Sequence, residues 1–187
     1  MAILKFRVSY EEDDTIYRDI AIKHSQTFQD LHYAILDAYE FDRKHKATFF
    51  RSNDGWERGR EISLELYDKR YAAPPLIMVE TKIASEIKDT NQKFIYLYDF
   101  IKNWTFQISL ISVVKEENPR FAYPLVTRKE GIGPPQNGIR SLLGEKFADI
   151  EEKYDLKEVG DGFSDDGEEA TESEDAQEDD NNFTDDL

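Results

Sequence analysis

The sequence predicts an α+β fold, in which a curved antiparallel sheet with a long hairpin packs against one main helix and several short helices. Three observations predict it: apolar residues alternate near the N-terminus, recur at helical spacing after residue 27, and alternate again over residues 94–114. Period-two alternation is typical of half-buried strands, whereas recurrence every three or four residues is typical of a helix with one buried face.

Charge divides the chain into two parts with different expected behaviour. The formal net charge of the 187 residues is −16, and residues 155–187 contribute −14 of it, from 15 acidic residues and one basic residue. Residues 1–154 are nearly neutral and contain most of the aromatic side chains. A segment with many like charges and few apolar residues cannot offset the entropy cost of ordering. We therefore predict one folded domain over residues 1–154 and a disordered acidic tail over residues 155–187.

The N-terminal part of the domain is expected to form a hairpin and the main helix. Residues 4–22 alternate between apolar and polar side chains around a polar turn at residues 11–14, which is typical of a hairpin. Thr27 and Asp30 have the spacing of a capping box, which satisfies free amides at a helix start. We expect this helix over residues 27–39. Its buried face would consist of Phe28, Leu31, Ile35 and Tyr39.

The middle of the domain predicts shorter elements. We expect a strand over residues 47–51, a turn at 52–55 and a short strand within 61–67. The apolar residues 76–79 follow two prolines and suit either a strand or a tight helical turn, and residues 83–88 suit a short helix.

The long hairpin is the clearest β signal. Residues 94–100 and 104–114 both alternate, and residues 101–103 separate them. Both faces of this hairpin are largely apolar near its middle, which predicts that the main helix covers one face of the sheet. Residues 131–138 then form a turn-rich loop, and two helical segments are expected within residues 139–154.

Composition excludes several classes of protein. The chain has no cysteine, which rules out disulfides, thiolate metal sites and a cysteine nucleophile. No apolar segment approaches the roughly 18 residues of a membrane span, and the N-terminus lacks a signal-peptide pattern. We therefore expect a soluble, cytoplasmic protein with no membrane partner. We also expect no cofactor, because the sequence has no Gly-rich phosphate loop and no nucleophile elbow.

Four groups of residues, in order along the chain, carry a family resemblance: Ile16-Tyr17-Arg18; Leu31-His32; Tyr96-Leu97-Tyr98-Asp99-Phe100 with Trp104; and Tyr123-Pro124 with Gly131 and Pro134-Pro135. Together they resemble the plasmid pRiA4b ORF-three-like family, whose members occur as passengers on plasmids and transposons. The resemblance covers most of residues 3–145. It implies an α+β fold with a curved antiparallel sheet, and it implies little about activity, because the family's biochemistry is largely unassigned.

The chain departs from the family pattern at three places. Ile101-Lys102 replaces Gly-Asp, Gln136-Asn137 replaces Glu-Asp, and Phe106 stands where the family commonly has His. Carboxylates and imidazoles bind metals and transfer protons, so these departures weaken a catalytic interpretation.

A ligand groove is predicted where the helix start, the hairpin over residues 96–104 and the 131–138 loop would meet. Its candidate residues are Arg18, His32, Tyr96, Tyr98, Asp99, Trp104, Pro134 and Pro135.

Two of these groove residues have competing interpretations. For His32 we favour a partly buried imidazole with a hydrogen-bond partner over a metal ligand, since no second ligand lies four residues on. Asp99, placed in mid-strand, would cap the amides of the turn at residues 101–103, pair with Arg18, or act as a pocket carboxylate with a perturbed pKa.

A second candidate surface is basic and aromatic. Its residues, which are possible nucleic-acid contacts, are Arg43, Lys44, Lys46, Arg51, Trp56, Arg58 and Arg60. Aromatic rings among cations can stack on bases, but neighbouring acidic residues favour a mixed-charge surface. The acidic tail would be a solubilising extension, a decoy that occupies these basic residues, or a docking segment for a basic partner.

These residues favour a non-enzymatic interaction module of mobile-element type with a modulating acidic tail. Its partner would be an unknown protein or nucleic acid, and we assign no catalytic residue and no metal. The alternative is a metal-assisted nucleic-acid enzyme or a DNA-binding protein linked to transposition or plasmid function. The sequence leaves the oligomeric state open.

Overall fold

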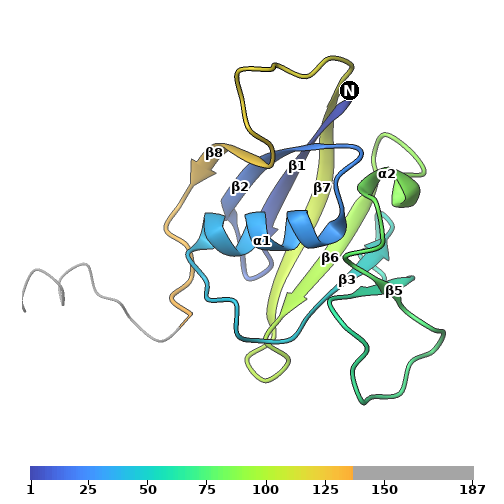
Figure 1. Ribbon diagram of the computed structural model, residues 1–187. Coiled ribbons are helices and arrows are strands. Elements are labelled where there is room, and N and C mark those ends of the chain that lie inside the picture. Colours follow the sequence, from blue (N-terminus) through green and yellow to red (C-terminus); the bar gives the residue numbers. More distant parts are fainter. Residues whose placement is uncertain (137–187) are drawn as a thin grey trace, which may run out of the picture. The chain divides into compact units, whose positions relative to one another are not determined.

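An eight-stranded sheet with one long helix against a single face is the main feature of the computed structural model, which describes residues 1–136 (Figure 1). The order of strands across the sheet is β5-β4-β3-β6-β7-β1-β2-β8. The strands are β1 (Ile3–Tyr10), β2 (Asp13–Lys23), β3 (Ala47–Ser52), β4 (Glu61–Ser63), β5 (Leu76–Ile77), β6 (Lys93–Tyr98), β7 (Trp104–Val114) and β8 (Leu125–Glu130).

The sheet is mixed, so the prediction of a purely antiparallel sheet is wrong in one place. Strands β4 and β5 pair in parallel, and every other neighbouring pair is antiparallel. A long segment with Pro74 and Pro75 separates β4 from β5, and parallel neighbours need such a crossover instead of a tight turn. The apolar residues 76–79 therefore contribute a two-residue strand.

Helix α1 (Phe28–Tyr39) begins as the capping box predicts. Thr27 Oγ1 accepts a hydrogen bond from the Asp30 amide at 3.3 Å, and Asp30 Oδ2 accepts one from the Thr27 amide at 2.8 Å. The helix ends at Glu40, whose φ of 59° is left-handed and turns the chain out of the helix. The short helix predicted within residues 83–88 is α2 (Ile83–Glu86).

The hydrophobic core lies between α1 and the sheet and is rich in aromatic rings. Phe28 on the helix packs edge-on against Phe49 and Phe94 on the sheet, each with ring centroids 5.2 Å apart. Tyr39, one helix length away, packs against Phe106 at 4.6 Å. Such pairs add roughly 0.5–1.5 kcal/mol each beyond the area they bury, so they anchor both ends of α1 on the sheet.

The hairpin of β6 and β7 differs from its prediction at one important residue. Strand β6 ends at Tyr98, so Asp99 lies in the turn and not in mid-strand. Asp99 and Asn103 both have left-handed φ values, of 56° and 55°, and the Asn103 amide donates to the Asp99 carbonyl at 2.6 Å. Asn and Asp tolerate this conformation better than other residues with side chains, which explains why the turn begins at this aspartate.

The predicted helical segments within residues 139–154 and the acidic tail over 155–187 lie outside the described residues, as do the last two residues of the 131–138 loop. Within residues 1–136, no helix is both long and apolar enough to cross a bilayer.

Candidate functional site

Helix α1 holds His32 against the middle of strand β6. His32 Nδ1 lies 2.7 Å from the Tyr96 hydroxyl, and both side chains are buried. Burial, and to a lesser extent the charge of Arg43, lower the pKa of His32 to about 4, so the imidazole is neutral at neutral pH. The prediction of a buried histidine with a hydrogen-bond partner is therefore confirmed, although its burial is complete and not partial.

Asp42 joins the segment after α1 to the hairpin and to the end of the described chain. Its Oδ1 accepts hydrogen bonds from the Tyr98 hydroxyl at 2.7 Å and from Gln136 Nε2 at 2.9 Å. Its amide donates to Gln136 Oε1 at 2.7 Å. Burial alone would raise the pKa of Asp42, but the bonds from Gln136, Tyr98 and the Lys44 amide, with the nearby His45, lower it to about 2.

Asp99 braces the turn between β6 and β7. Its Oδ1 accepts hydrogen bonds from the Ile101 amide at 3.1 Å and the Lys102 amide at 3.4 Å. Its Oδ2 lies 3.5 Å from His45 Nδ1, and the other ring nitrogen of His45 lies 3.7 Å from Asp42 Oδ1. The turn-capping interpretation of Asp99 is confirmed, and the structure adds an imidazole held between two carboxylates.

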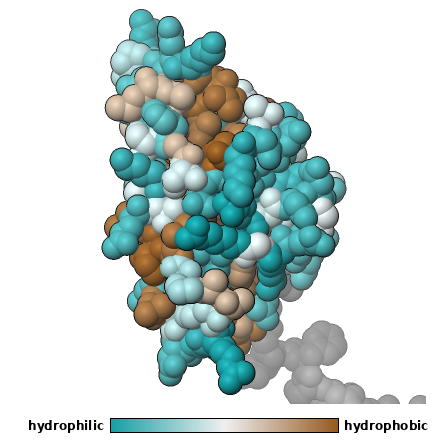
Figure 2. Space-filling view, turned by 90° about the vertical axis from the view of Figure 1, so that its right-hand side faces the viewer, coloured by the Kyte–Doolittle hydropathy of each residue, from teal (hydrophilic) through white to brown (hydrophobic). Residues whose placement is uncertain are grey.

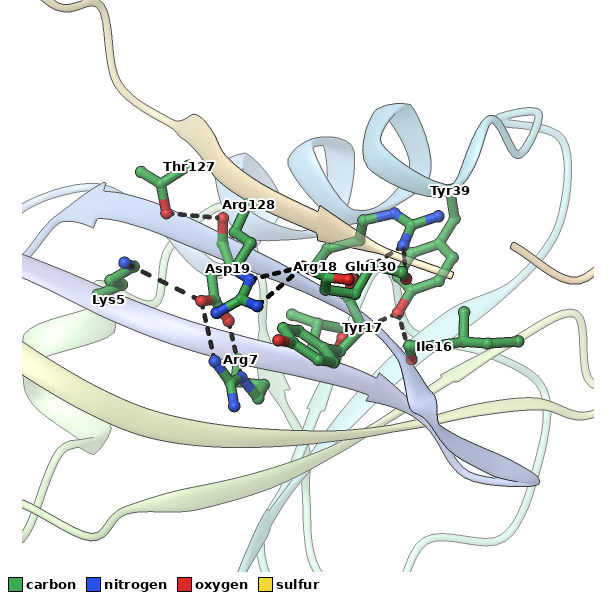
Figure 3. A network of polar contacts seen from close by, with 11 residues as sticks. Lys5, Arg7, Ile16, Tyr17, Arg18, Asp19, Tyr39, Thr127, Arg128 and Glu130 are labelled. Atoms are coloured by element: carbon green, nitrogen blue, oxygen red, sulfur yellow. Dashed lines mark hydrogen bonds and ion pairs between the residues drawn. The ribbon is translucent and has the colours of Figure 1, made fainter. Parts of the chain in front are cut away.

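Arg18 has a different partner set from the one considered for it (Figure 3). It lies on the helix-facing side of β2 and is buried, and its Nε donates to the Ala38 carbonyl at 3.1 Å. A terminal nitrogen donates to the Gly131 carbonyl at 3.2 Å, and the guanidinium lies 4.7 Å from the Tyr39 ring centroid. The predicted pairing of Arg18 with Asp99 is wrong, because backbone carbonyls at the end of α1 and after β8 satisfy this guanidinium.

The predicted groove places the start of the helix beside the hairpin, whereas in the structure the chain after the helix end lies there. The start of α1 faces the segment before α2, where the Phe28 amide donates to the Thr81 carbonyl at 3.0 Å. The residues after the helix end meet the hairpin instead: Phe41 packs against Trp104 with ring centroids 5.3 Å apart. Arg18 fixes this arrangement, since it ties the start of the 131–136 segment to the last turn of α1. Pro134 and Pro135 lie in this segment, partly or largely exposed.

The residues that the structure brings together define the turn site: Asp42, His45, Tyr98, Asp99, Lys102 and Gln136. Lys102 closes it by donating from Nζ to the Gln136 carbonyl at 2.6 Å. Four members of the site, Asp42, His45, Lys102 and Gln136, are not among the residues predicted for the groove. The spacing of three residues between Asp42 and His45, directly after a helix end, is a weak signal for this pairing.

The basic and aromatic residues fall into two groups along strand β3. Arg43, Lys44 and Lys46 precede strand β3, whereas Arg51 and the residues up to Arg60 lie at its far end. At about 3.3 Å per residue, the six-residue strand separates the two groups by roughly 17 Å.

Most of the arginines among these residues have partners within the chain. Arg43 pairs with Asp37 at 2.7 Å, and Arg51 pairs with Glu86 at 2.9 Å. Arg58 lies over the Phe50 ring, 5.2 Å from its centroid. Arg51 and Arg58 also line a polar cavity of about 480 Å³, together with both acidic and basic residues. A nucleic-acid role for these residues stays a prediction.

The face of the sheet opposite α1 carries a second polar network, also drawn in Figure 3. Arg7 donates two hydrogen bonds, of 2.9 and 3.1 Å, to the buried carboxylate of Asp19, and Lys5 Nζ lies 4.0 Å from the same carboxylate. The Arg7 guanidinium lies 4.0 Å from the centre of the Tyr17 ring. The guanidinium of Arg128, on β8, lies 5.5 Å from the centre of the same ring. Among residues 1–136, no three His, Asp or Glu side chains gather closely enough to hold a metal ion.

The geometry explains the four motif groups as bonded pairs. His32 on the helix meets Tyr96 on β6, and Arg18 on β2 meets Gly131 after β8.

A solved structure of a protein of unknown function from Methanosarcina mazei Go1 has a similar fold, with a TM-score of 0.63 at 20% identity over 87% of this chain and 91% of that chain. No curated protein matches the sequence. The family model described as plasmid pRiA4b ORF-3-like protein matches residues 2–144. The chain therefore belongs to the plasmid pRiA4b ORF-3-like protein family.

Proposed function

We propose that this domain is a non-enzymatic interaction module that binds a protein partner through the turn between β6 and β7. The observation that carries the proposal is the exposure of Ile101, which is 91% exposed at the tip of a turn held by hydrogen bonds. A single exposed apolar residue is common on protein surfaces. Here the backbone on both sides of it is fixed by hydrogen bonds, which lowers the entropy cost of binding.

The polar groups of the turn site support binding in preference to chemistry. Asp99 Oδ1, the Tyr98 hydroxyl and the Gln136 amide are all engaged in bonds that hold the turn in place. His45 is more accessible, with 37% of its side chain exposed. A partner would therefore meet one apolar tip and one imidazole, presented on a rigid frame.

The charge distribution supports a protein partner over a nucleic acid. Nucleic-acid affinity depends mainly on cations that neutralise phosphates. Arg7, Arg43, Arg51 and Arg128 each pair with a carboxylate of the same chain. Residues 1–154 are also slightly acidic overall. We further propose, from the sequence, that the acidic tail modulates binding by excluding anionic partners.

A site-specific cross-linking experiment tests the proposal. A photoreactive amino acid placed at position 101 should capture a defined host protein, and the purified partner should bind the wild type but not Ile101→Asp. The same amino acid at Leu66, which is 72% exposed in a different loop, is the matched control.

Two results would overturn the proposal. One is capture at position 101 that does not exceed capture at position 66. The other is tight binding of a single-stranded or double-stranded DNA oligonucleotide that Ile101→Asp leaves unchanged, which would favour a nucleic-acid role.

A further inference from the structure

Strand β7 extends beyond its neighbour β6 and leaves part of one edge open. The pairing of β6 with β7 begins at Lys93 opposite Ser109, and the Leu110 amide still donates to the Gln92 carbonyl at 2.9 Å. We name residues Ile111–Val114 the β7 overhang. Ser112, Val113 and Val114 pair with β1 on their other side, and Ile111 is the extra residue of a bulge in that pairing. Among residues 1–136, no backbone hydrogen bond reaches the overhang from the side that β6 has left.

The overhang has the chemistry of a strand that can still pair. Its sequence, Ile-Ser-Val-Val, contains three β-branched apolar residues, no charge and no proline. Ile111, Val113 and Val114 are 42%, 48% and 50% exposed. Figure 2, which views the molecule from the right-hand side of Figure 1, shows one hydrophobic patch in the upper part of the view and others lower down. The upper end of β7 lies at the height of this upper patch in Figure 1.

The two outer edges of the sheet are protected in ways that the overhang is not. Edge strand β8 carries Arg128-Lys129-Glu130, and edge strand β5 is two residues long. Charged side chains and short length are the usual means by which an edge avoids pairing with another chain. The overhang has one feature that disfavours pairing with another chain, the bulge between Lys5 and Phe6 in the β1–β7 pairing. Beyond this bulge, Val113 and Val114 remain paired with β1.

We propose that the β7 overhang pairs antiparallel with the overhang of a second copy of this chain, so that two sheets join across a two-fold axis. A two-fold axis places the same surface on both subunits, and an uncharged strand offers no like-charge repulsion to its own copy. Residues 1–154 are nearly neutral, which also permits close approach of two copies.

Charge at the ends of the overhang favours a second copy as the occupant. In the antiparallel arrangement, β7 of the second copy continues past its overhang toward the start of β6 in the first copy. Glu116 of the second copy then lies toward Gln92 and Lys93 of the first. Lys88 lies at this end, because its amide donates to Gln92 Oε1 at 3.3 Å. Glu116 and Lys88 are both exposed, and the two-fold axis produces this opposite-charge pair twice.

The expected dimer is weak and concentration-dependent, because four residues a side bury far less than the roughly 800 Å² per partner of a standard interface. Sedimentation equilibrium of the full chain over a range of concentrations should show a monomer–dimer equilibrium. Val113→Lys should weaken it by about tenfold or more, since lysine on a strand edge opposes pairing. Leu66→Lys, on an exposed loop residue, should leave the equilibrium unchanged.

A charge-reversal pair tests the orientation of the strands. Glu116→Lys alone should weaken the dimer, and Glu116→Lys combined with Lys88→Glu should restore it. Amide exchange at residues 111–114 should slow as protein concentration rises. A chain that is monomeric at every concentration would overturn the proposal. So would a dimer that Val113→Lys and Leu66→Lys affect equally, or one that leaves exchange at residues 111–114 unchanged.

Discussion

The Tyr96 hydroxyl lies 2.7 Å from His32 Nδ1, and this buried contact joins the main helix to the centre of the sheet. Both residues belong to motif groups of the family, yet neither is exposed to a ligand. Arg18 on β2 similarly joins the end of α1 to the segment after β8 through its hydrogen bonds to backbone carbonyls. The motif residues thus hold the turn site in place, while at that end Ile101 is exposed and His45 is partly exposed.

The first prediction concerns the pH dependence of stability. The pKa of His32 is about 4 in the folded protein and about 6.5 when unfolded, so below pH 6.5 the unfolded chain binds a proton that the folded chain excludes. Stability should therefore fall as pH decreases from 6.5 toward 4, by about 2 kcal/mol between pH 7 and pH 5. Urea unfolding at several pH values measures this. His32→Phe should have a flatter profile over the same range, and equal slopes would contradict the assignment.

A second prediction separates two substitutions of Asp99. Asp99→Asn keeps an oxygen that can accept from the Ile101 and Lys102 amides, and asparagine tolerates the left-handed φ of 56°. We expect it to change the free energy of unfolding by less than about 1 kcal/mol. Asp99→Ala removes the acceptor and should cost about 1–3 kcal/mol.

Thermal and urea denaturation compare these two Asp99 variants. A large loss of stability in Asp99→Asn would mean that the charge of the carboxylate, through His45, matters more than its role as a hydrogen-bond acceptor.

The third prediction concerns Arg18 as the residue that positions the 131–136 segment. Arg18→Met leaves buried carbonyl groups, including those of Ala38 and Gly131, without their donor, so unfolding should become easier by about 2–4 kcal/mol. Hydrogen exchange should also accelerate in residues 131–136. Arg128→Met, which removes an exposed arginine paired with Glu130, is the control and should have little effect on either measurement.

A fourth prediction tests the modulating role of the acidic tail. Replacing the Asp and Glu residues of 155–187 with Asn and Gln keeps the chain length and removes most of the net charge of −14. Binding to a single-stranded DNA oligonucleotide should become tighter at low salt, and the difference should disappear as salt rises and screens the tail. Fluorescence anisotropy of labelled DNA measures both. Equal affinities at low salt would exclude an electrostatic role for the tail.

Local patterns in the sequence were sufficient where neighbouring residues decide the structure. The Thr27–Asp30 capping box, the α1 spacing and the alternation in β7 all depend on residues within a few positions of one another. Asp99 was assigned to mid-strand because alternation continues through it, but two left-handed residues end the strand earlier. Alternation shows which face a side chain takes, and it does not show where the backbone changes direction.

The sequence by itself determined the helix, most of the strands, the apolar core and the family membership, because each depends on short-range periodicity or on ordered motifs. Only the tertiary structure decided which end of α1 lies beside the hairpin. It also decided that His45 lies between Asp42 and Asp99, and that β7 extends beyond the start of β6. Those relations join residues far apart in the chain. They are set by how the helix and the strands pack together, which no local pattern encodes.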